Sequence, residues 1–222
     1  MRVNLDTGPV LDCPAFILGN SPFLPTDDLP VLAEKFTIGV NRIAEVFAPT
    51  VLLWVDGIVY AETAERMDGC GALTVCDISV RRRPSHLGLH TWVGGEAHRR
   101  RSEVHKLCCD GNTGCCAARW AIALGCWPVW LAGMDSAYRD GKTDFWGHNR
   151  HHHRDGPNPT LVVMRRETDR LFADFGDTVR HIRDGEHLRE VAAACDEVDQ
   201  QSLKDRIRLA LIARGVEVHG ES

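Results

Sequence analysis

The residues best suited to chemistry begin with a short polar turn near the start of the chain. Gly19, Asn20, Ser21 and Pro22 end and follow the apolar run 15–19. A glycine lets a ligand approach the backbone, and the Asn and Ser side chains offer hydrogen bonds. The turn is therefore a candidate ligand-binding loop, although an ordinary Asn-containing turn would show the same residues.

A second polar cluster, Asp110 to Gly114, directly precedes residues 115–124, whose alanine and leucine content favours a helix. Unpaired N–H groups and the positive end of the helix dipole suit this position to phosphate. Asn112, Thr113 and Gly114 are the candidate contacts, and Thr113 could equally serve only as the helix cap. The cluster is not a P-loop, because the GxxxxGK[ST] pattern is absent.

The third polar cluster is the loop from Asp135 to Asn158, which holds four histidines and four aspartates. These residues could bind a divalent metal or supply a general base, or they could simply form a solvated loop. Three consecutive histidines cannot all face one ion, so we expect no metal cage. A single histidine acting as base is the more economical interpretation.

The cysteines predict neither a disulfide framework nor a structural zinc site. Their number, nine, is odd. The pairs Cys108-Cys109 and Cys115-Cys116 flank a five-residue loop, whereas zinc sites usually show a C-x2-4-C spacing. In a helix, Cys115 and Cys116 would also point about 100° apart.

Charge is unevenly distributed along the 222 residues, whose formal net charge is −5. The segment 81–106 carries seven Lys and Arg residues against two Glu, and we expect it to form an exposed insertion or a long loop. It could bind DNA or another polyanion, although a solvated charged face is the common alternative. The arginines concerned are Arg81, Arg82, Arg83, Arg99, Arg100 and Arg101.

Short apolar runs alternating with helix-like segments indicate the elements that would position these clusters. Strand-like runs occupy 15–19, 36–40, 51–55, 72–76 and 128–135, and a further strand is indicated at 179–182. Helices are predicted after Thr26, which can cap the first of them, around 61–67, and at 115–124, 160–175 and 202–215.

This alternation predicts an α/β fold, a Rossmann-like open and mostly parallel sheet with helices on both faces, in a single domain over 1–222. Ligands bind beyond the carboxyl ends of the strands in such sheets, where each polar cluster falls. No apolar run approaches the roughly 20 residues of a membrane-spanning helix, and the first residues lack a secretory pattern. We expect a cytoplasmic protein without a membrane partner, and a homo-oligomer is left open.

Several short motifs together resemble a known layout. They are ILGNSP near the start, Val40-Asn41-Arg42 at the end of a strand, Asn112-Thr113-Gly114 before AARWAIALG, VWLAGMD, and Gly147-His148. The set resembles the bacterial sialyltransferases that use CMP-sialic acid. It is also similar to the archaeal 6-hydroxymethylpterin diphosphokinase family and to a large group of phage proteins.

The resemblance implies a nucleotide site. It would place the nucleotide phosphates near Gly19, Asn20, Ser21 and Thr113-Gly114, and the nucleotide ring or ribose near Asn41. His148 would match the base that removes the acceptor hydroxyl proton, and we take Asp135 as a second candidate catalytic residue. Thr113 stands where the sialyltransferases carry serine, and residues 60–106 do not match in detail.

Three functions follow as expectations. The first is a glycosyltransferase that moves a sugar from a nucleotide-sugar donor to an acceptor hydroxyl, with His148 as base. The second is a diphosphokinase acting on a hydroxymethylpterin-like alcohol, in which Mg²⁺ would bind Asp56, Asp135 and Asp144. The third is a phage-type DNA-modifying or nucleic-acid-associated protein that uses the basic segment 81–106.

Overall fold

Eight short strands pair side by side in parallel in the computed structural model, which describes residues 10–92, 103–135, 142 and 159–217. Across the described residues the order is β6-β5-β4-β3-β2-β1-β7-β8. The strands are β1 Ala15–Leu18, β2 Thr37–Val40, β3 Val51–Trp54, β4 Leu73–Asp77, β5 Leu87–Trp92, β6 Lys106–Cys108, β7 Val129–Ala132 and β8 Val179–His181.

The strand order reverses at β1. From β1 the chain adds β2 to β6 one after another on one side, and then returns to place β7 on the other side of β1. Because every pairing is parallel, the carboxyl ends of all eight strands lie along one edge of the sheet. The prediction of an α/β fold with an open, largely parallel sheet is confirmed.

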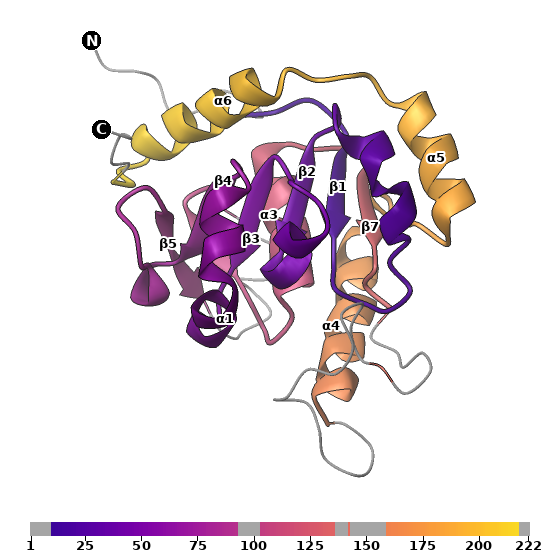
Figure 1. Ribbon diagram of the computed structural model, residues 1–222, viewed down its shortest axis with the longest axis horizontal. Helices are drawn as coiled ribbons and strands as arrows, with labels where there is room; N and C mark the ends of the chain where they lie inside the picture. Colours follow the sequence, from indigo (N-terminus) through magenta and orange to yellow (C-terminus); the bar gives the residue numbers. More distant parts are fainter. Residues whose placement is uncertain (1–9, 93–102, 136–141, 143–158, 218–222) are drawn as a thin grey trace.

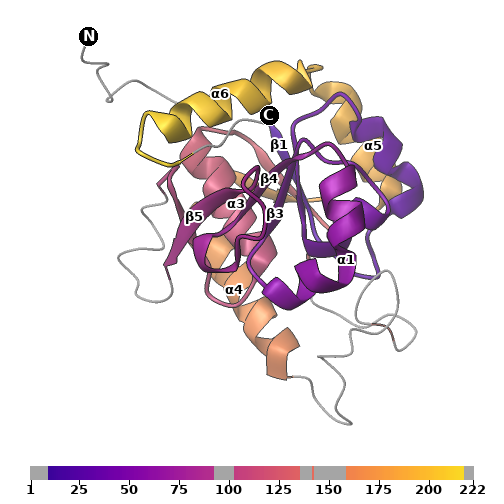
Figure 2. The ribbon, with the colours of Figure 1, turned by 60° about the vertical axis from the view of Figure 1, so that its left-hand side comes forward.

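Helices cover both faces of the sheet (Figures 1 and 2). One buried cluster joins the sheet to α3, α4 and α6, and a second joins the opposite face to η1, η2, α1 and α5. The bounds are η1 Thr26–Leu32, η2 Asn41–Glu45, α1 Gly57–Gly69, η3 Ile78–Val80, α3 Thr113–Leu124, α4 Pro159–Phe175, α5 Gly185–Ala194 and α6 Gln200–Ile212.

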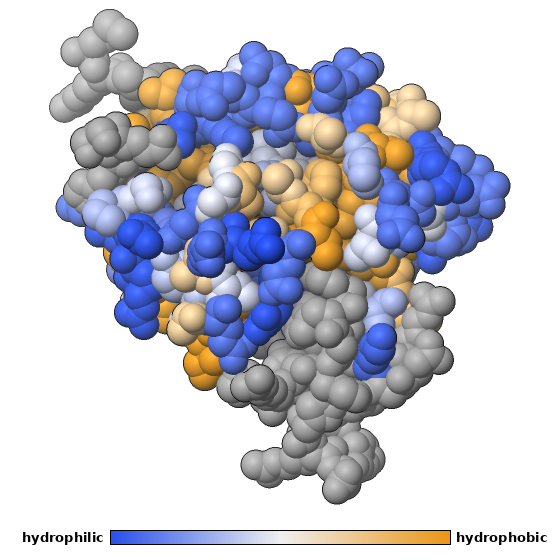
Figure 3. Space-filling view, in the orientation of Figure 1, coloured by the Kyte–Doolittle hydropathy of each residue, from blue (hydrophilic) through white to orange (hydrophobic). Residues whose placement is uncertain are grey.

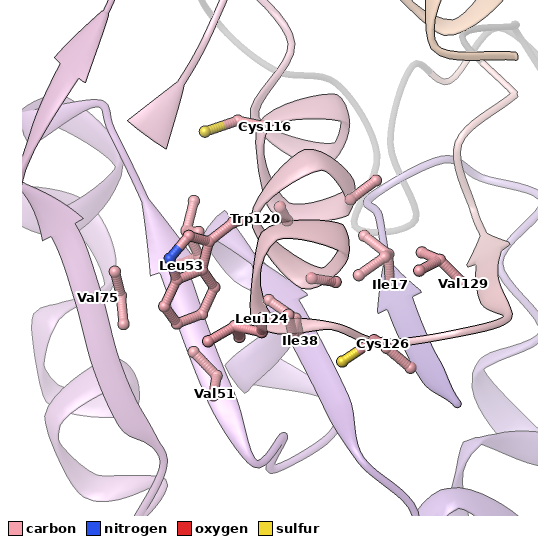
Figure 4. Close-up of a cluster of buried hydrophobic side chains, with 14 of the residues drawn as sticks. Ile17, Ile38, Val51, Leu53, Val75, Cys116, Trp120, Leu124, Cys126 and Val129 are labelled. Carbon is pink, nitrogen blue, oxygen red and sulfur yellow. The ribbon is translucent and has the colours of Figure 1, made fainter. Parts of the chain in front are cut away.

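The central strands are continuous apolar runs because both of their faces are buried. Their side chains alternate between the two clusters: Leu53 packs beneath α3, while Leu52 and Trp54 pack on the face of α1. Figure 4 shows Trp120 and Leu124 of α3 lying against the strand side chains of the first cluster.

Helix α3 is buried on almost every side, and its ends are set by local chemistry. The Asn112 side chain accepts hydrogen bonds at the first turn, and Gly125 ends the helix in the left-handed conformation, with φ at 97°. The helix predicted at 115–124 is confirmed, and it begins two residues earlier, at Thr113. Asn112, however, is the cap, and not Thr113.

Helix α6 crosses the amino ends of the strands, along the edge opposite the carboxyl ends (Figure 1). Gln200 donates a hydrogen bond to the Lys35 carbonyl, just before β2, and Lys204 donates one to the Gly71 carbonyl, just before β4. Arg206 reaches the Val10 carbonyl. These contacts tie the end of the chain to the edge where the strands begin.

Two expectations about elements are wrong. The segment 81–106 is not simply an exposed loop, because it contains β5 and the first residue of β6, whose Leu87 and Leu89 are buried in the sheet. Thr26 does not cap an α-helix: it is the first residue of the 3-10 helix η1, whose N-cap is Pro25, without a side-chain hydrogen bond. Pro30 inside η1 lacks the N–H that a longer helix would need.

The surface in the orientation of Figure 1 combines an apolar area on the side of η1 and η2 with hydrophilic residues around it (Figure 3). Within the part of the chain that the structure describes, no helix has the length and apolar character needed to cross a bilayer.

A buried ion pair joins α3 to α4. Arg119 and Glu167 are both fully buried, and the Arg119 Nη2 lies 3.6 Å from the Glu167 Oε2. Arg170 gives Glu167 a second, closer partner at 2.5 Å, whereas the guanidinium nitrogens of Arg119 have no hydrogen-bond partner among the described residues. The two charges are therefore unequally compensated.

This asymmetry predicts different costs for removing either partner. Glu167→Gln leaves a buried guanidinium without its carboxylate, and we expect it to lower the free energy of unfolding by about 3–5 kcal/mol. Arg119→Met roughly preserves volume and leaves Glu167 with Arg170, so its cost should be smaller. Urea unfolding measures both, with Arg66→Met on the exposed side of α1 as a control outside this cluster. Equal losses for Glu167→Gln and Arg119→Met would contradict the prediction.

Candidate functional site

The described candidate residues gather at the carboxyl edge of the sheet. Gly19, Asn20 and Ser21 follow β1, Asn41 follows β2, and Asp56 follows β3. Asp135 follows β7, and Asn112, Thr113 and Gly114 form the start of α3. Parallel pairing thus brings together clusters that are far apart in the sequence, at the edge where open α/β sheets bind ligands.

Gly19 has a packing role at this edge. Its N–H donates to the Ala132 carbonyl at 2.8 Å, and the Ser21 N–H donates to the Gly133 carbonyl at 3.0 Å. A Cβ at Gly19 would collide with the Gly133 carbonyl and lie 2.8 Å from the Met134 Sδ. The space left by the missing side chain of Gly19 is therefore occupied by the backbone after β7, and not left open for a ligand.

Ser21 forms hydrogen bonds within its own loop. The side chain is buried, and its Oγ accepts a hydrogen bond from the Phe23 N–H at 3.2 Å. The Ser21 carbonyl accepts one from the Leu24 N–H. Ser21 thus stabilises the turn that presents Asn20.

The N-terminus of α3 is capped and covered. The Asn112 Oδ1 accepts hydrogen bonds from the Gly114 and Cys115 N–H groups, and its Nδ2 donates to the Met164 carbonyl of α4. A Cβ at Gly114 would collide with the Met134 side chain. Two N–H groups at the start of α3, where the sequence predicts a phosphate site, are therefore already bonded to Asn112. The Thr113 side chain is half-buried.

Asn20 and Asn41 carry side-chain oxygens that are buried without a hydrogen-bond partner among the described residues. They follow β1 and β2, which are neighbours in the sheet. Asn41 has a φ of 52°, a left-handed conformation that asparagine adopts more readily than most residues. Because buried amide oxygens are normally bonded, these two are suited to donors on a ligand.

Asp135 faces a histidine that the sequence did not suggest. The His181 Nε2, at the end of β8, lies 3.5 Å from the Asp135 Oδ1, and both side chains are partly exposed. The pair forms because β7 and β8 are neighbours in register, with Leu131 opposite His181. The only signal in the sequence was the position of His181 near the end of the strand indicated at 179–182.

Two carboxylates at the edge mainly serve local structure. The Asp56 Oδ1 accepts a hydrogen bond from the Ile58 N–H as the cap of α1. Asp77, at the end of β4, accepts from the Ser79 and Thr91 N–H groups. Burial alone would raise the pKa of Asp77, but these hydrogen bonds and the nearby Ser79 and Thr91 hydroxyls lower it below its usual 3.8.

Buried thiols lie in and beside the first turn of α3. Cys109 and Cys116 form a hydrogen-bonded thiol pair, and burial raises the pKa of Cys115 to about 12. All nine cysteines are free. Within the described residues, no three His, Cys, Asp or Glu side chains are grouped so that they could hold a metal ion.

The described arginines of the basic segment 81–106 lie at different places on the sheet. Arg83 bonds to Asp68, on the side of the sheet where the strands begin, whereas the Arg82 guanidinium lies near Gly57, the first residue of α1 at the carboxyl edge. Arg81 packs beside Gly88 of β5. Arg99, Arg100 and Arg101 lie outside the described residues, as do His148 and Asp144.

Comparisons of the chain with protein-family models, with curated proteins and with solved structures give no match.

The packing at Gly19 predicts a strong effect from one methyl group. We expect Gly19→Ala to lower the free energy of unfolding by at least about 1–3 kcal/mol, because the new Cβ would displace the loop after β7. Gly69→Ala is the control, since a Cβ there meets open space in the last turn of α1. Urea unfolding of both variants is the measurement, and an unchanged Gly19→Ala midpoint would contradict the packing role.

Proposed function

We propose that the protein is a nucleotide-dependent transferase, and that it moves a sugar from a nucleotide-sugar donor to an acceptor hydroxyl. The observation that carries the proposal is the pair of asparagine amides at neighbouring strand ends, Asn20 and Asn41, whose buried oxygens have no hydrogen-bond partner in the part of the chain that the structure describes. An amide both accepts and donates hydrogen bonds, as do the edge of a nucleobase and the hydroxyls of a ribose.

A row of polar groups extends over four adjacent strands. It runs from His181 of β8 through Asp135 after β7 and Asn20 after β1 to Asn41 after β2. With strands about 4.8 Å apart, three steps extend over roughly 14 Å. This length accommodates a donor at one end and an acid–base group at the other.

In this proposal a histidine removes the proton from the acceptor hydroxyl. The hydroxyl oxygen then forms a bond to the anomeric carbon, and the bond between that carbon and the nucleotide phosphate breaks. The resemblance assigns the base to His148, which lies outside the described residues. His181 is a second candidate, because Asp135 is placed to orient its ring.

The carboxylates favour sugar transfer over diphosphate transfer. A diphosphokinase needs Mg²⁺ bound across the phosphates, and Asp56, Asp135 and Asp144 were the expected ligands. Asp56 caps α1, and Asp135 faces His181. Transfer that persists in excess EDTA would exclude the diphosphokinase alternative.

Binding is tested by thermal shift with CMP, UDP, GDP, ADP and their sugars. A ligand that binds only the folded protein stabilises it by about 2.7 kcal/mol at a hundred times its Kd. Asn41→Gly removes the amide and keeps a residue that adopts positive φ, so we expect the free Tm to stay close to wild type and the ligand shift to fall. If the shift is unchanged, Asn41 does not bind the nucleotide; if no nucleotide stabilises the wild type, the proposal is wrong.

The base is assigned with His148→Ala and His181→Asn, assayed with the donor selected by the binding screen. Loss of the base should lower kcat by about 10²–10⁴-fold and leave nucleotide affinity nearly unchanged. A large loss in His181→Asn alone identifies His181, and a large loss in His148→Ala alone identifies His148. Full activity in both variants would rule out His148 and His181 as the base.

A further inference from the structure

A cavity of about 450 Å³ lies at the edge of the sheet opposite the candidate site. Its wall is formed by the end of α1, the start of β4, the residues before β5, and α6. This volume is within the range of small-molecule sites, roughly 300–1,000 Å³. Strand β4 has five residues at about 3.3 Å each, so a ligand here would lie roughly 17 Å from the carboxyl edge.

The cavity wall is positively charged. Arg83, Lys204 and Arg208 face a single carboxylate, Asp68, among its lining residues. Lys204 and Arg208 are four residues apart on α6 and so lie on one side of that helix. The Lys204 ammonium donates to the Gly71 carbonyl and has no carboxylate partner among the described residues, whereas Arg208 pairs with Asp205.

A hydrogen-bond network fixes the inner wall. Asp68 accepts hydrogen bonds from the Tyr60 hydroxyl at 2.9 Å and from the Arg83 Nε at 3.0 Å, and its other oxygen lies 3.1 Å from the His86 Nε2. With three donors, the Asp68 carboxylate has little capacity left for a cation. Tyr60 also stacks on Trp54, which holds the network against the core.

His86 supplies the second observation. It is 2% exposed and lines the cavity, and its Nδ1 has no hydrogen-bond partner among the described residues. Burial, against the opposing effect of Asp68, lowers the pKa of His86, so the ring is neutral at pH 7. With its Nε2 proton directed to Asp68, the Nδ1 is an acceptor that is itself buried beneath the cavity wall, so a ligand hydroxyl or N–H donor reaches it only when the side chains around it move apart.

From this geometry we infer that the cavity binds a small phosphorylated hydroxy compound, such as a sugar phosphate. Lys204, Arg208 and Arg83 would bind the phosphate, and the His86 Nδ1 would accept a hydrogen bond from a ligand hydroxyl. The distance from the carboxyl edge makes this a separate binding site, so a ligand here would act on the protein without being its transferred group.

The test measures the affinity of the full chain for a hexose 6-phosphate, with inorganic phosphate, the free hexose and a short DNA duplex as comparison ligands. We expect the hexose phosphate to bind most tightly. Lys204→Met/Arg208→Met should weaken it at least about tenfold, because two cationic contacts are lost. Arg206→Met is the matched control, since it removes a charge of the same helix that does not line the cavity.

Two further variants separate the alternatives. Asn41→Gly should leave hexose phosphate binding unchanged, because Asn41 lies at the other edge; a loss would place the ligand in the candidate site. His86→Asn should reduce the preference for the hexose phosphate over inorganic phosphate. Equal affinity of wild type and Lys204→Met/Arg208→Met, or binding of the DNA duplex alone, would overturn the inference.

Discussion

The close approach of the loops after β1 and β7 is the constraint on which the carboxyl edge depends. The order in which the chain adds strands reverses between β1 and β7, which pair in parallel. The Gly19 N–H continues this pairing beyond the last residue of β1. The Gly133 carbonyl occupies the space that a side chain at position 19 would fill. This contact sets where Asn20, Met134 and Asp135 lie, and Met134 in turn covers the start of α3.

Much of the fold could be predicted because its signals are local. Short, mostly apolar runs, buried on both faces, mark the central strands, and Gly125 marks the end of α3. Strand β5 was missed because the histidines and arginines around it masked the alternation of Leu87, Leu89 and Thr91. That alternation is what a strand near the edge of a sheet shows.

The candidate site was predicted less completely. Polar residues after strands indicated the right edge, since parallel strands share the direction of their carboxyl ends. The sequence could not show that Gly19 faces Gly133, or that Asn112 both caps α3 and bonds to α4, because these contacts join distant segments. His181 was missed for the same reason: its pairing with Asp135 depends on the register of β7 and β8.

The strand order also has a consequence for how the chain is made. Strand β1 ends at Leu18, but β7, its second neighbour in the sheet, begins only at Val129 and so leaves the ribosome much later. At about 5–20 residues per second, β1 therefore waits roughly 6–20 s with an apolar edge unpaired. The nascent chain cannot complete the centre of its sheet until the β7 segment is released, so a translational pause before that point would prolong the interval in which β1 is open to association with other chains.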